Sequence, residues 1–184
     1  MSIVLSYVDK NKAIMGCDGL VVNSAFEPIN QNYKKIHKIN QNILVGYAGE
    51  LNSCEFLVNF LRNQTFSDII SSMYVEDVVA FFNSCFQHYN VDKAGFLVSG
   101  ISKRQQLCSA SIASYSVQKI DYIKANIVYN GLYPEEISRD ENLFKKHIIK
   151  QQGNIRKAMF DTIREVSERS PSVNNVCYLE EVVL

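Results

Sequence analysis

Residues 1–19 read MSIVLSYVDKNKAIMGCDG and contain two segments with strand character joined by a polar turn. Side chains in residues 2–8 alternate between two faces, as in a β-strand: Ile3, Leu5 and Tyr7 share one face, and Ser2, Val4, Ser6 and Val8 share the other. The turn is DKNK, and the returning strand, AIMGCD, is small or apolar almost throughout, which indicates burial. The chain therefore opens with a predicted β-hairpin that ends at Asp18.

The segments that follow predict a polar loop and then two further strands. Residues 20–33 contain Pro28 and the run NQN, and they favour a loop with at most a short strand at its start. Residues 35–39 and 42–48 then have strand character and are joined at INQN. With the first hairpin, these strands predict an antiparallel meander.

Helical periodicity begins at Glu50 and continues to about Asn63, and a second helix is expected over roughly residues 75–89. Further strands are predicted at residues 95–102, 107–115 and within 121–129, followed by helices at roughly 134–151 and 154–169 and a closing strand at 175–183. Strands and pairs of helices therefore alternate in blocks. This order favours an α+β fold in which two antiparallel sheets pack face to face between helices, a four-layer αββα sandwich, over a doubly wound parallel fold.

Composition describes an ordinary soluble protein with one domain, residues 1–184. The 184 residues are 47% hydrophobic and 21% charged, and the formal net charge is zero. Neither nucleic acid nor an anionic membrane is expected as a partner, because both select a basic surface. We find no apolar run long enough for a membrane span and no secretory signal at the amino terminus, so a cytoplasmic location is expected.

The cysteines and histidines indicate no metal site and no organic cofactor. Five cysteines are scattered without a C-x-x-C pair, which predicts reduced, mostly buried thiols. Cys17, beside Asp18, is an alternative internal nucleophile, but a neighbouring carboxylate raises the pKa of a thiol, so a structural role is favoured. The three histidines lie apart and are assigned no role.

Four features in residues 1–50, taken in order, resemble one family. They are the start MSIV, the small-small-Asp turn GCDG, the lysine before an apolar residue in KKI, and the Gly-x-x-Gly strand end GYAG. Together with the order of elements, they resemble proteasome beta subunits and the bacterial HslV peptidase, which are N-terminal-nucleophile hydrolases. The resemblance in element order extends over most of the chain, and it implies the same αββα sandwich.

The resemblance implies an active site made of Ser2, Asp18, Lys35 and Gly46. Ser2 would be the nucleophile and would use its own α-amine as general base, since that amine ordinarily has a pKa of about 7.7–8.0. Asp18 would orient Lys35, whose positive charge lowers the pKa of neighbouring groups, and the Gly46 amide would form the oxyanion hole.

The alignment of the first residue leaves two registers open. Counted directly, Met1 occupies the place of the family's threonine, and no catalytic hydroxyl is present. If Met1 is removed, Ser2 becomes the first residue, and its spacing of sixteen residues to Asp18 matches the family's interval. Lys35 is then one residue late, so that either a one-residue insertion in the loop or Lys34 accounts for the family's lysine.

Two later segments depart from the family pattern. Its Gly-Ser-Gly segment corresponds to residues 129–132, YNGL, without the serine. Its Asp-x-x-Ser-Gly segment corresponds to residues 169–173, RSPSV, where Ser172 is retained and Arg169 replaces the aspartate.

These departures leave two functions open. One is a peptidase or amidohydrolase that acts on a peptide or amide substrate. The other is a catalytically inactive subunit with a structural or binding role. In either case the resemblance implies a homo-oligomeric ring, with an ATP-dependent unfoldase as a further partner.

Overall fold

The structure is a computed structural model that describes residues 2–89, 91, 93–114, 116–122, 125–129 and 134–184. Two antiparallel sheets form its centre, with strand orders β10-β1-β2-β11 and β5-β6-β7-β8-β9. The first sheet contains β1 (Ile3–Val8), β2 (Lys12–Asp18), β10 (Ala125–Tyr129) and β11 (Cys177–Val183). The second contains β5 (Ile36–Asn40), β6 (Ile43–Gly49), β7 (Ala94–Ile101), β8 (Leu107–Ala113) and β9 (Ser116–Tyr122).

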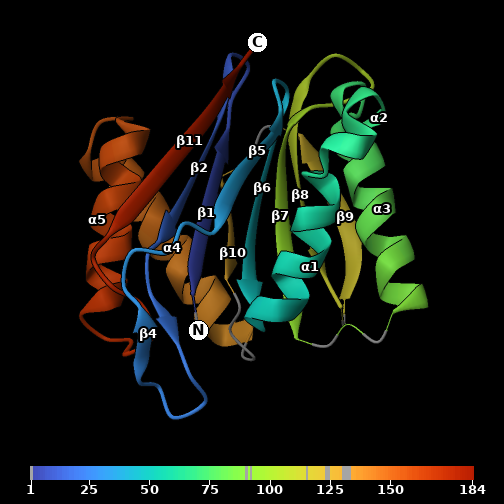
Figure 1. Cartoon of the computed structure of the whole chain (residues 1–184). Coiled ribbons are helices and arrows are strands. Elements are labelled where there is room, and N and C mark those ends of the chain that lie inside the picture. The colour runs from blue at the N-terminus through green and yellow to red at the C-terminus, as the bar shows by residue number, and fades with distance from the viewer. Residues whose placement is uncertain (1, 90, 92, 115, 123–124, 130–133) are drawn as a thin grey trace.

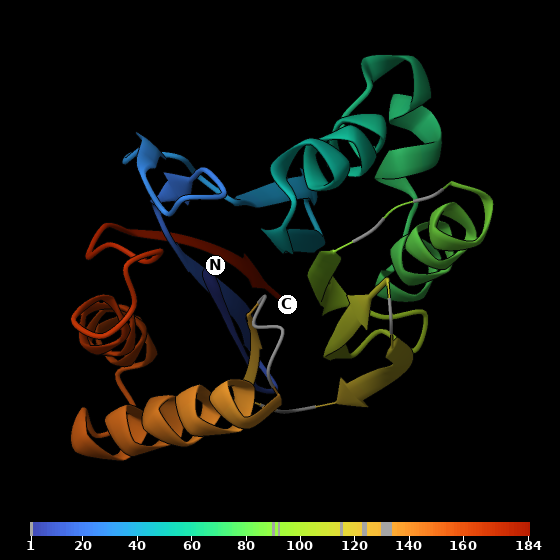
Figure 2. The same cartoon turned by 90° about the horizontal axis from the view of Figure 1, so that it is seen from below.

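Helices cover the outer face of each sheet (Figure 1). On the five-stranded sheet lie α1 (Leu51–Leu61), a 3-10 helix η1 (Gln64–Phe66), α2 (Ser67–Ser71) and α3 (Val75–His88). On the four-stranded sheet lie α4 (Pro134–Lys150) and α5 (Ile155–Ser167). Viewed from below, the two helical layers are on opposite sides of the sheets (Figure 2). The fold is the predicted four-layer αββα sandwich.

Three hydrophobic cores hold the four layers together. One lies between the five-stranded sheet and α1 and α3, and contains Phe82 and Phe96. A second lies between the four-stranded sheet and α4 and α5, and contains Ile3 and Phe144. The third lies between the two sheets. Strand β1 contributes to two of these cores, because its alternating faces meet α5 on one side and the other sheet on the opposite side.

The predicted meander was wrong. Strands β1 and β2 pair with each other in the four-stranded sheet, whereas β5 and β6 pair in the five-stranded sheet. The intervening segment, residues 19–35, therefore crosses from one sheet to the other. It also forms a small projecting hairpin of β3 (Val21–Val22) and β4 (Pro28–Asn30), of which only the first strand was expected.

Other elements were found close to their predicted bounds, with three additions. The single strand expected within residues 121–129 is the β10 edge of the first sheet, and a separate strand, β9, precedes it. The short helices η1 and α2 fill the segment between α1 and α3. None of the helices in the described part of the chain combines the length and apolar character that a membrane span needs.

Candidate active site

Asp18 lies at the end of β2, fully buried, and its carboxylate is surrounded by donors. Oδ1 accepts a hydrogen bond from the Ile3 amide at 3.0 Å, and Oδ2 accepts one from the Leu20 amide at 2.9 Å. The Lys35 ammonium completes the set, with Nζ 2.8 Å from Oδ1. A buried carboxylate needs such partners to remain charged. The structure thus brings together Asp18 and Lys35, as the sequence predicted.

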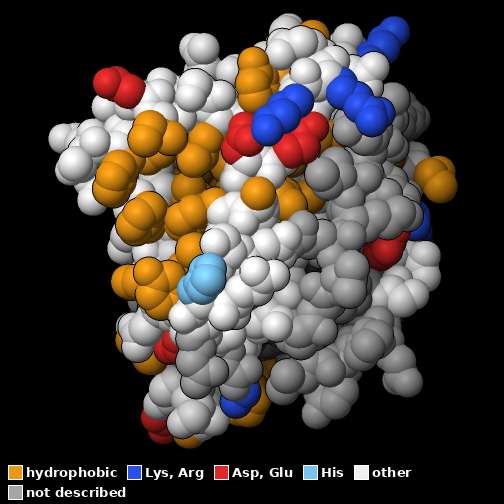
Figure 3. All heavy atoms as spheres, turned by 90° about the vertical axis from the view of Figure 1, so that its right-hand side faces the viewer, with side chains coloured by type: hydrophobic (Ala, Val, Ile, Leu, Met, Phe, Trp, Pro, Cys, Tyr) orange, Lys and Arg blue, Asp and Glu red, His pale blue; other side chains and the backbone are white. Residues whose placement is uncertain are grey.

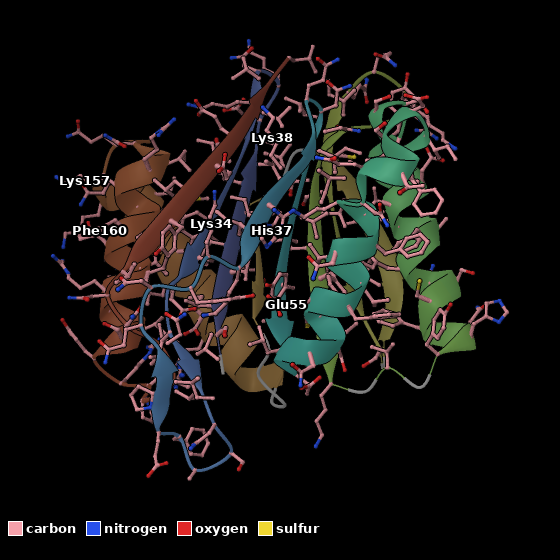
Figure 4. All side chains as sticks on the ribbon, in the orientation of Figure 1. Lys34, His37, Lys38, Glu55, Lys157 and Phe160 are labelled. Atoms are coloured by element: carbon pink, nitrogen blue, oxygen red, sulfur yellow. The ribbon has the colours of Figure 1, made fainter. Side chains whose placement is uncertain are left out.

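The adjacent lysines Lys34 and Lys35 point to different partners. The Lys35 side chain is 3% exposed and pairs with Asp18, whereas that of Lys34 is 41% exposed and pairs with Glu180 on β11. Figure 4 shows Lys34 near β11, on the surface. Of the two candidates for the family's lysine, Lys35 is therefore the one in contact with the aspartate.

Lys35 also faces a pocket of about 770 Å³ at the lower end of the sandwich. Apolar side chains from the segment after β2 form one wall, and the end of β6 and the start of α1 form another. Ser2 and Lys35 both line this pocket. The complete lining is Ser2, Leu20, Val21, Val22, Asn23, Ser24, Phe26, Ile29, Lys35, Tyr47, Ala48, Gly49, Glu50, Leu51, Asn52 and Lys93.

The position of Ser2 is determined by its neighbour in the chain. Strand β1 begins at Ile3, and the Ile3 amide donates to Asp18, the same carboxylate that binds Lys35. Ser2 is the residue immediately before this anchor. The β1–β2 hairpin therefore places Ser2 and Asp18 at one site, and the segment directly before β5, in the other sheet, brings Lys35 to it.

The structure does not bring Gly46 to the pocket wall. A Cβ at Gly46 would lie 2.6 Å from a methyl group of Val4 and 2.7 Å from the sulfur of Met15, so this glycine permits close packing between the sheets. Its amide also points away from the pocket. The Tyr47 amide donates to the Lys35 carbonyl at 3.1 Å, and successive amides in a strand point in opposite directions, so the Gly46 amide faces β7.

The backbone amide of Gly49, at the end of β6, points in the direction that was expected of the Gly46 amide. The Glu50 amide donates to the Lys93 carbonyl at 2.9 Å on the β7 side, so the Gly49 amide points to the opposite side. There it lies beyond the first residue of β5, on the pocket wall. Gly49 has φ of +142°, and a Cβ would lie 2.1 Å from the Lys93 carbonyl oxygen, so only glycine fits.

The family comparison agrees with this geometry. The family model described as "Proteasome subunit" matches residues 2–92, a segment that includes Ser2, Asp18, Lys35 and the end of β6. The segment of residues 2–92, about half of the chain, belongs to the proteasome family. Membership in this family implies a ring-type assembly. A comparison with curated proteins found no match.

Asn174 is a residue of this proteasome-like site that the sequence did not reveal. Its Oδ1 accepts from the Gly19 amide at 2.9 Å, and its Nδ2 donates to the Gln31 carbonyl at 2.8 Å. The Tyr33 amide in turn donates to the Gly19 carbonyl at 2.9 Å. Asn174 thus ties the turn after Asp18 to the segment before Lys35. No local motif predicts this contact, since 155 residues separate Asn174 from Gly19.

The segment that departs from the family pattern at residues 169–173 does not contribute to the pocket. Arg169, at the family's aspartate position, pairs with Asp140 on α4, and Ser172 is buried with its hydroxyl 3.1 Å from that of Ser170. Neither Arg169 nor Ser172 lines the pocket. The Gly-Ser-Gly counterpart, residues 129–132, lies outside the described residues except for Tyr129, of which only the backbone is described.

The remaining candidates do not contribute a reactive group to the site. Burial raises the pKa of the Cys17 thiol to about 12, which opposes thiolate formation, and the five cysteines are free. His37 stacks on Tyr47, with ring centroids 5.7 Å apart. Burial, together with the charges of Arg62 and Lys34, lowers the pKa of His37 to about 4. Within the described residues, no three His, Cys, Asp or Glu side chains gather as a metal site would require.

Proposed function

We propose that the protein is an N-terminal-nucleophile hydrolase in which Ser2, exposed by removal of Met1, attacks a peptide or amide bond. The observation that carries this proposal is the buried Lys35–Asp18 pair, 2.8 Å apart, on the wall of a pocket that Ser2 also lines. Burial of a lysine that is 3% exposed is unfavourable unless its charge is paired, and Asp18 supplies that partner at the wall of the pocket. The pair therefore supports a site that uses a fixed positive charge.

In the proposed reaction, a proton passes from the hydroxyl of Ser2 to the α-amine of the same residue. The Ser2 α-amine accepts the proton of Oγ as Oγ attacks the carbonyl carbon, and a tetrahedral oxyanion forms. The amine then gives that proton to the leaving nitrogen, the carbon–nitrogen bond breaks, and an ester on Ser2 remains. Water hydrolyses the ester by the same sequence and restores the hydroxyl. Lys35 favours the neutral form of the nearby amine through its charge, and Asp18 holds Lys35 in place.

We propose Gly49 as the oxyanion donor in place of Gly46. The alternation of amides in β6 supports this choice, as does the presence of Gly49 on the pocket wall. A backbone donor of this kind acts without reorganisation, because the neighbouring Glu50 amide is hydrogen-bonded to the Lys93 carbonyl and holds this part of the backbone in place.

The pocket supports substrates with an apolar side chain. Leu20, Val21, Val22, Phe26 and Ile29 line it on the side of the β3–β4 hairpin. An unfoldase partner is a proposal that follows from the family resemblance, and a cytoplasmic location is proposed as well.

The proposal is tested by labelling with an electrophilic peptide that has an apolar side chain next to its reactive group. The protein is expressed without an amino-terminal tag, and intact mass spectrometry counts the adducts. We expect one adduct on the wild-type protein, at Ser2, and none on Ser2→Ala. Ser24→Ala removes another hydroxyl from the same pocket and serves as the matched control, which should label like the wild type.

The second candidate is a catalytically inactive ring subunit. The contact of Arg169 with Asp140 favours it, because a family position that normally carries an acidic residue is here occupied by a base that binds α4. This candidate predicts no adduct on any variant, together with copurification of a related chain that carries an intact amino-terminal threonine.

A further inference from the structure

A second cavity, of about 440 Å³, lies at the upper end of the sandwich, at the opposite end of α1 from the proposed active site (Figure 1). Helix α1 begins at Leu51, on the wall of the first pocket, and the residues at its other end line the second cavity. The remaining walls are the end of β5, the 3-10 helix η1 and α2. This volume is within the range of sites for small molecules.

Hydrogen bonds of Asn40 hold the walls of the second cavity together. Its Nδ2 donates to the Ile70 carbonyl at 2.7 Å and to the Met73 carbonyl at 3.2 Å. Its Oδ1 accepts from the Asn42 amide at 2.8 Å. These bonds join the end of β5 to α2 and to the residues after it. The cavity is therefore formed before a ligand binds, which lowers the free-energy cost of binding.

The second cavity combines an apolar floor with a rim of hydrogen-bond donors. Leu61 and Ile70 are buried and form the floor. Arg62 and Asn63 lie at the exposed rim. The Asn63 Oδ1 accepts from the Thr65 amide at 2.9 Å, so its Nδ2 is the group that faces a ligand as a donor.

Arg62 is the charged residue of this lining. None of the described residues that line the cavity is acidic, and Asp68 of α2 is outside the lining. Within the described residues the Arg62 guanidinium forms no ion pair. Its charge acts on its surroundings: burial and then the charge of Arg62 lower the pKa of His37 to about 4, with a further contribution from Lys34. The cavity therefore has a positive rim.

The outer surface of the same helical layer has a different character. Phe60, Phe66 and Ile69 are exposed there, and Figure 3 shows hydrophobic side chains gathered along one side of that surface. Such side chains offer no donor to an anion. The combination of a guanidinium and an amide around an apolar floor therefore belongs to the cavity and not to the apolar surface beside it.

We propose that the second cavity binds a small organic acid, with its carboxylate on Arg62 and Asn63 and its apolar part over Leu61 and Ile70. A guanidinium presents its N–H groups in a fork that matches the two oxygens of a carboxylate. A short apolar chain covers the floor, which an inorganic anion would leave in contact with water. Nothing in this proposal depends on Ser2, so it stands or falls separately from the proposed chemistry.

The proposal is tested by titrating the untagged full chain with butyrate at constant ionic strength, followed by saturation-transfer NMR. Butyramide has the same shape without the charge, and inorganic phosphate has charge without an apolar chain. The variant is Arg62→Gln, with Arg62→Lys as a second variant that keeps the charge but loses the fork. Arg62 is exposed, so both variants should fold, as melting curves will verify. Lys38→Gln is the matched control, because it removes a charge from an exposed residue of β5 outside the lining.

We expect butyrate to bind the wild-type protein with a Kd of about 1 mM, as suits a ligand of this size. Arg62→Gln should weaken binding about tenfold, the scale of one hydrogen bond to a charged group, and Arg62→Lys should weaken it less. Lys38→Gln should bind like the wild type, and butyramide and phosphate should bind at least about tenfold more weakly. Absence of butyrate binding would overturn the proposal. So would equal binding by the folded Arg62→Gln variant, an equal loss in Lys38→Gln, or equal binding of butyramide or phosphate.

Discussion

Two ion pairs, each with a buried aspartate, lie in the two halves of the chain and have different surroundings. Lys35–Asp18 joins the two sheets at the wall of a pocket, and both side chains are nearly inaccessible. Arg169–Asp140 joins the segment after α5 to α4, and the Arg169 side chain is 31% exposed. The first pair lies within the segment that matches the proteasome family model, and the second lies outside it. The adjoining pocket, rather than the ion pair itself, therefore distinguishes the first pair from the second.

The largest effect is expected from breaking the pocket pair with Lys35→Met. Asp18 would remain buried without its cation, which costs about 3–5 kcal/mol of unfolding free energy. Labelling of Ser2 should also fall by about 10³-fold, the scale of losing a member of a catalytic group. Urea unfolding and adduct kinetics measure the two effects separately.

The double variant Lys35→Met with Asp18→Asn separates stability from activity. It removes both charges, so most of the lost unfolding free energy should return while labelling stays low. Recovery of labelling along with stability would mean that the pair is only structural.

Breaking the second pair with Arg169→Met should have a smaller and different effect. Because Arg169 is partly exposed and Arg139 Nε also lies 3.6 Å from Asp140, we expect a loss of about 1–3 kcal/mol in unfolding free energy. The rate of Ser2 labelling should remain within about twofold of wild type, since Arg169 does not line the pocket. A fall in labelling comparable to that of Lys35→Met would remove the distinction between the two pairs.

Replacing Asn174 tests how far the pocket pair depends on its supports. Asn174→Leu removes the hydrogen bonds to Gly19 and Gln31, at a cost of about 1–2 kcal/mol in unfolding free energy. We expect labelling of Ser2 to fall about tenfold, because the turn after Asp18 loses its tie to the segment before Lys35. Labelling at the wild-type rate by the folded variant would show that Asp18 and Lys35 hold their positions without Asn174.

The smallest expected effect is the contribution of His37 to the pH dependence of the unfolding free energy. The folded-state pKa of His37, about 4, lies below its unfolded value of about 6.5, so the unfolded state binds more protons between these values. The contribution of His37 to the unfolding free energy is therefore fully present above pH 6.5 and declines as the pH falls towards 4. After allowance for solvent screening, we expect the unfolding free energy to be about 1 kcal/mol lower at pH 4.5 than at pH 7 because of His37. In His37→Gln this contribution should disappear, and an unchanged pH dependence would contradict the assignment.

Local sequence pattern was sufficient for most of the strands and helices and, through the family resemblance, for Asp18 of the pocket pair. The alternation in residues 2–8 predicted a strand with two faces, and β1 indeed contributes to two cores. The order of the motifs, through the family resemblance, pointed to Asp18 and Lys35, but it left Lys34 open as the family's lysine. These features depend on residues close together in the chain, which is why they could be recognised without a structure.

Features that depend on register or on distant contacts could not be predicted. Choosing between Gly46 and Gly49 requires knowledge of which amides in β6 face β5, and only the pairing of Tyr47 with Lys35 provides it. The sequence likewise contains no signal for the division of the first four strands between two sheets, since a hairpin has the same local pattern in either arrangement. The hydrogen bonds of Asn174 to Gly19 and Gln31 arise from the same long-range geometry.

The most direct measurement is the intact mass of the protein expressed without an amino-terminal tag. An active N-terminal nucleophile requires a free amine on Ser2, so the expected mass is that of the chain without Met1. A mass that includes Met1 on the whole population would contradict the proposed chemistry, because the only α-amine would then belong to a residue without a hydroxyl.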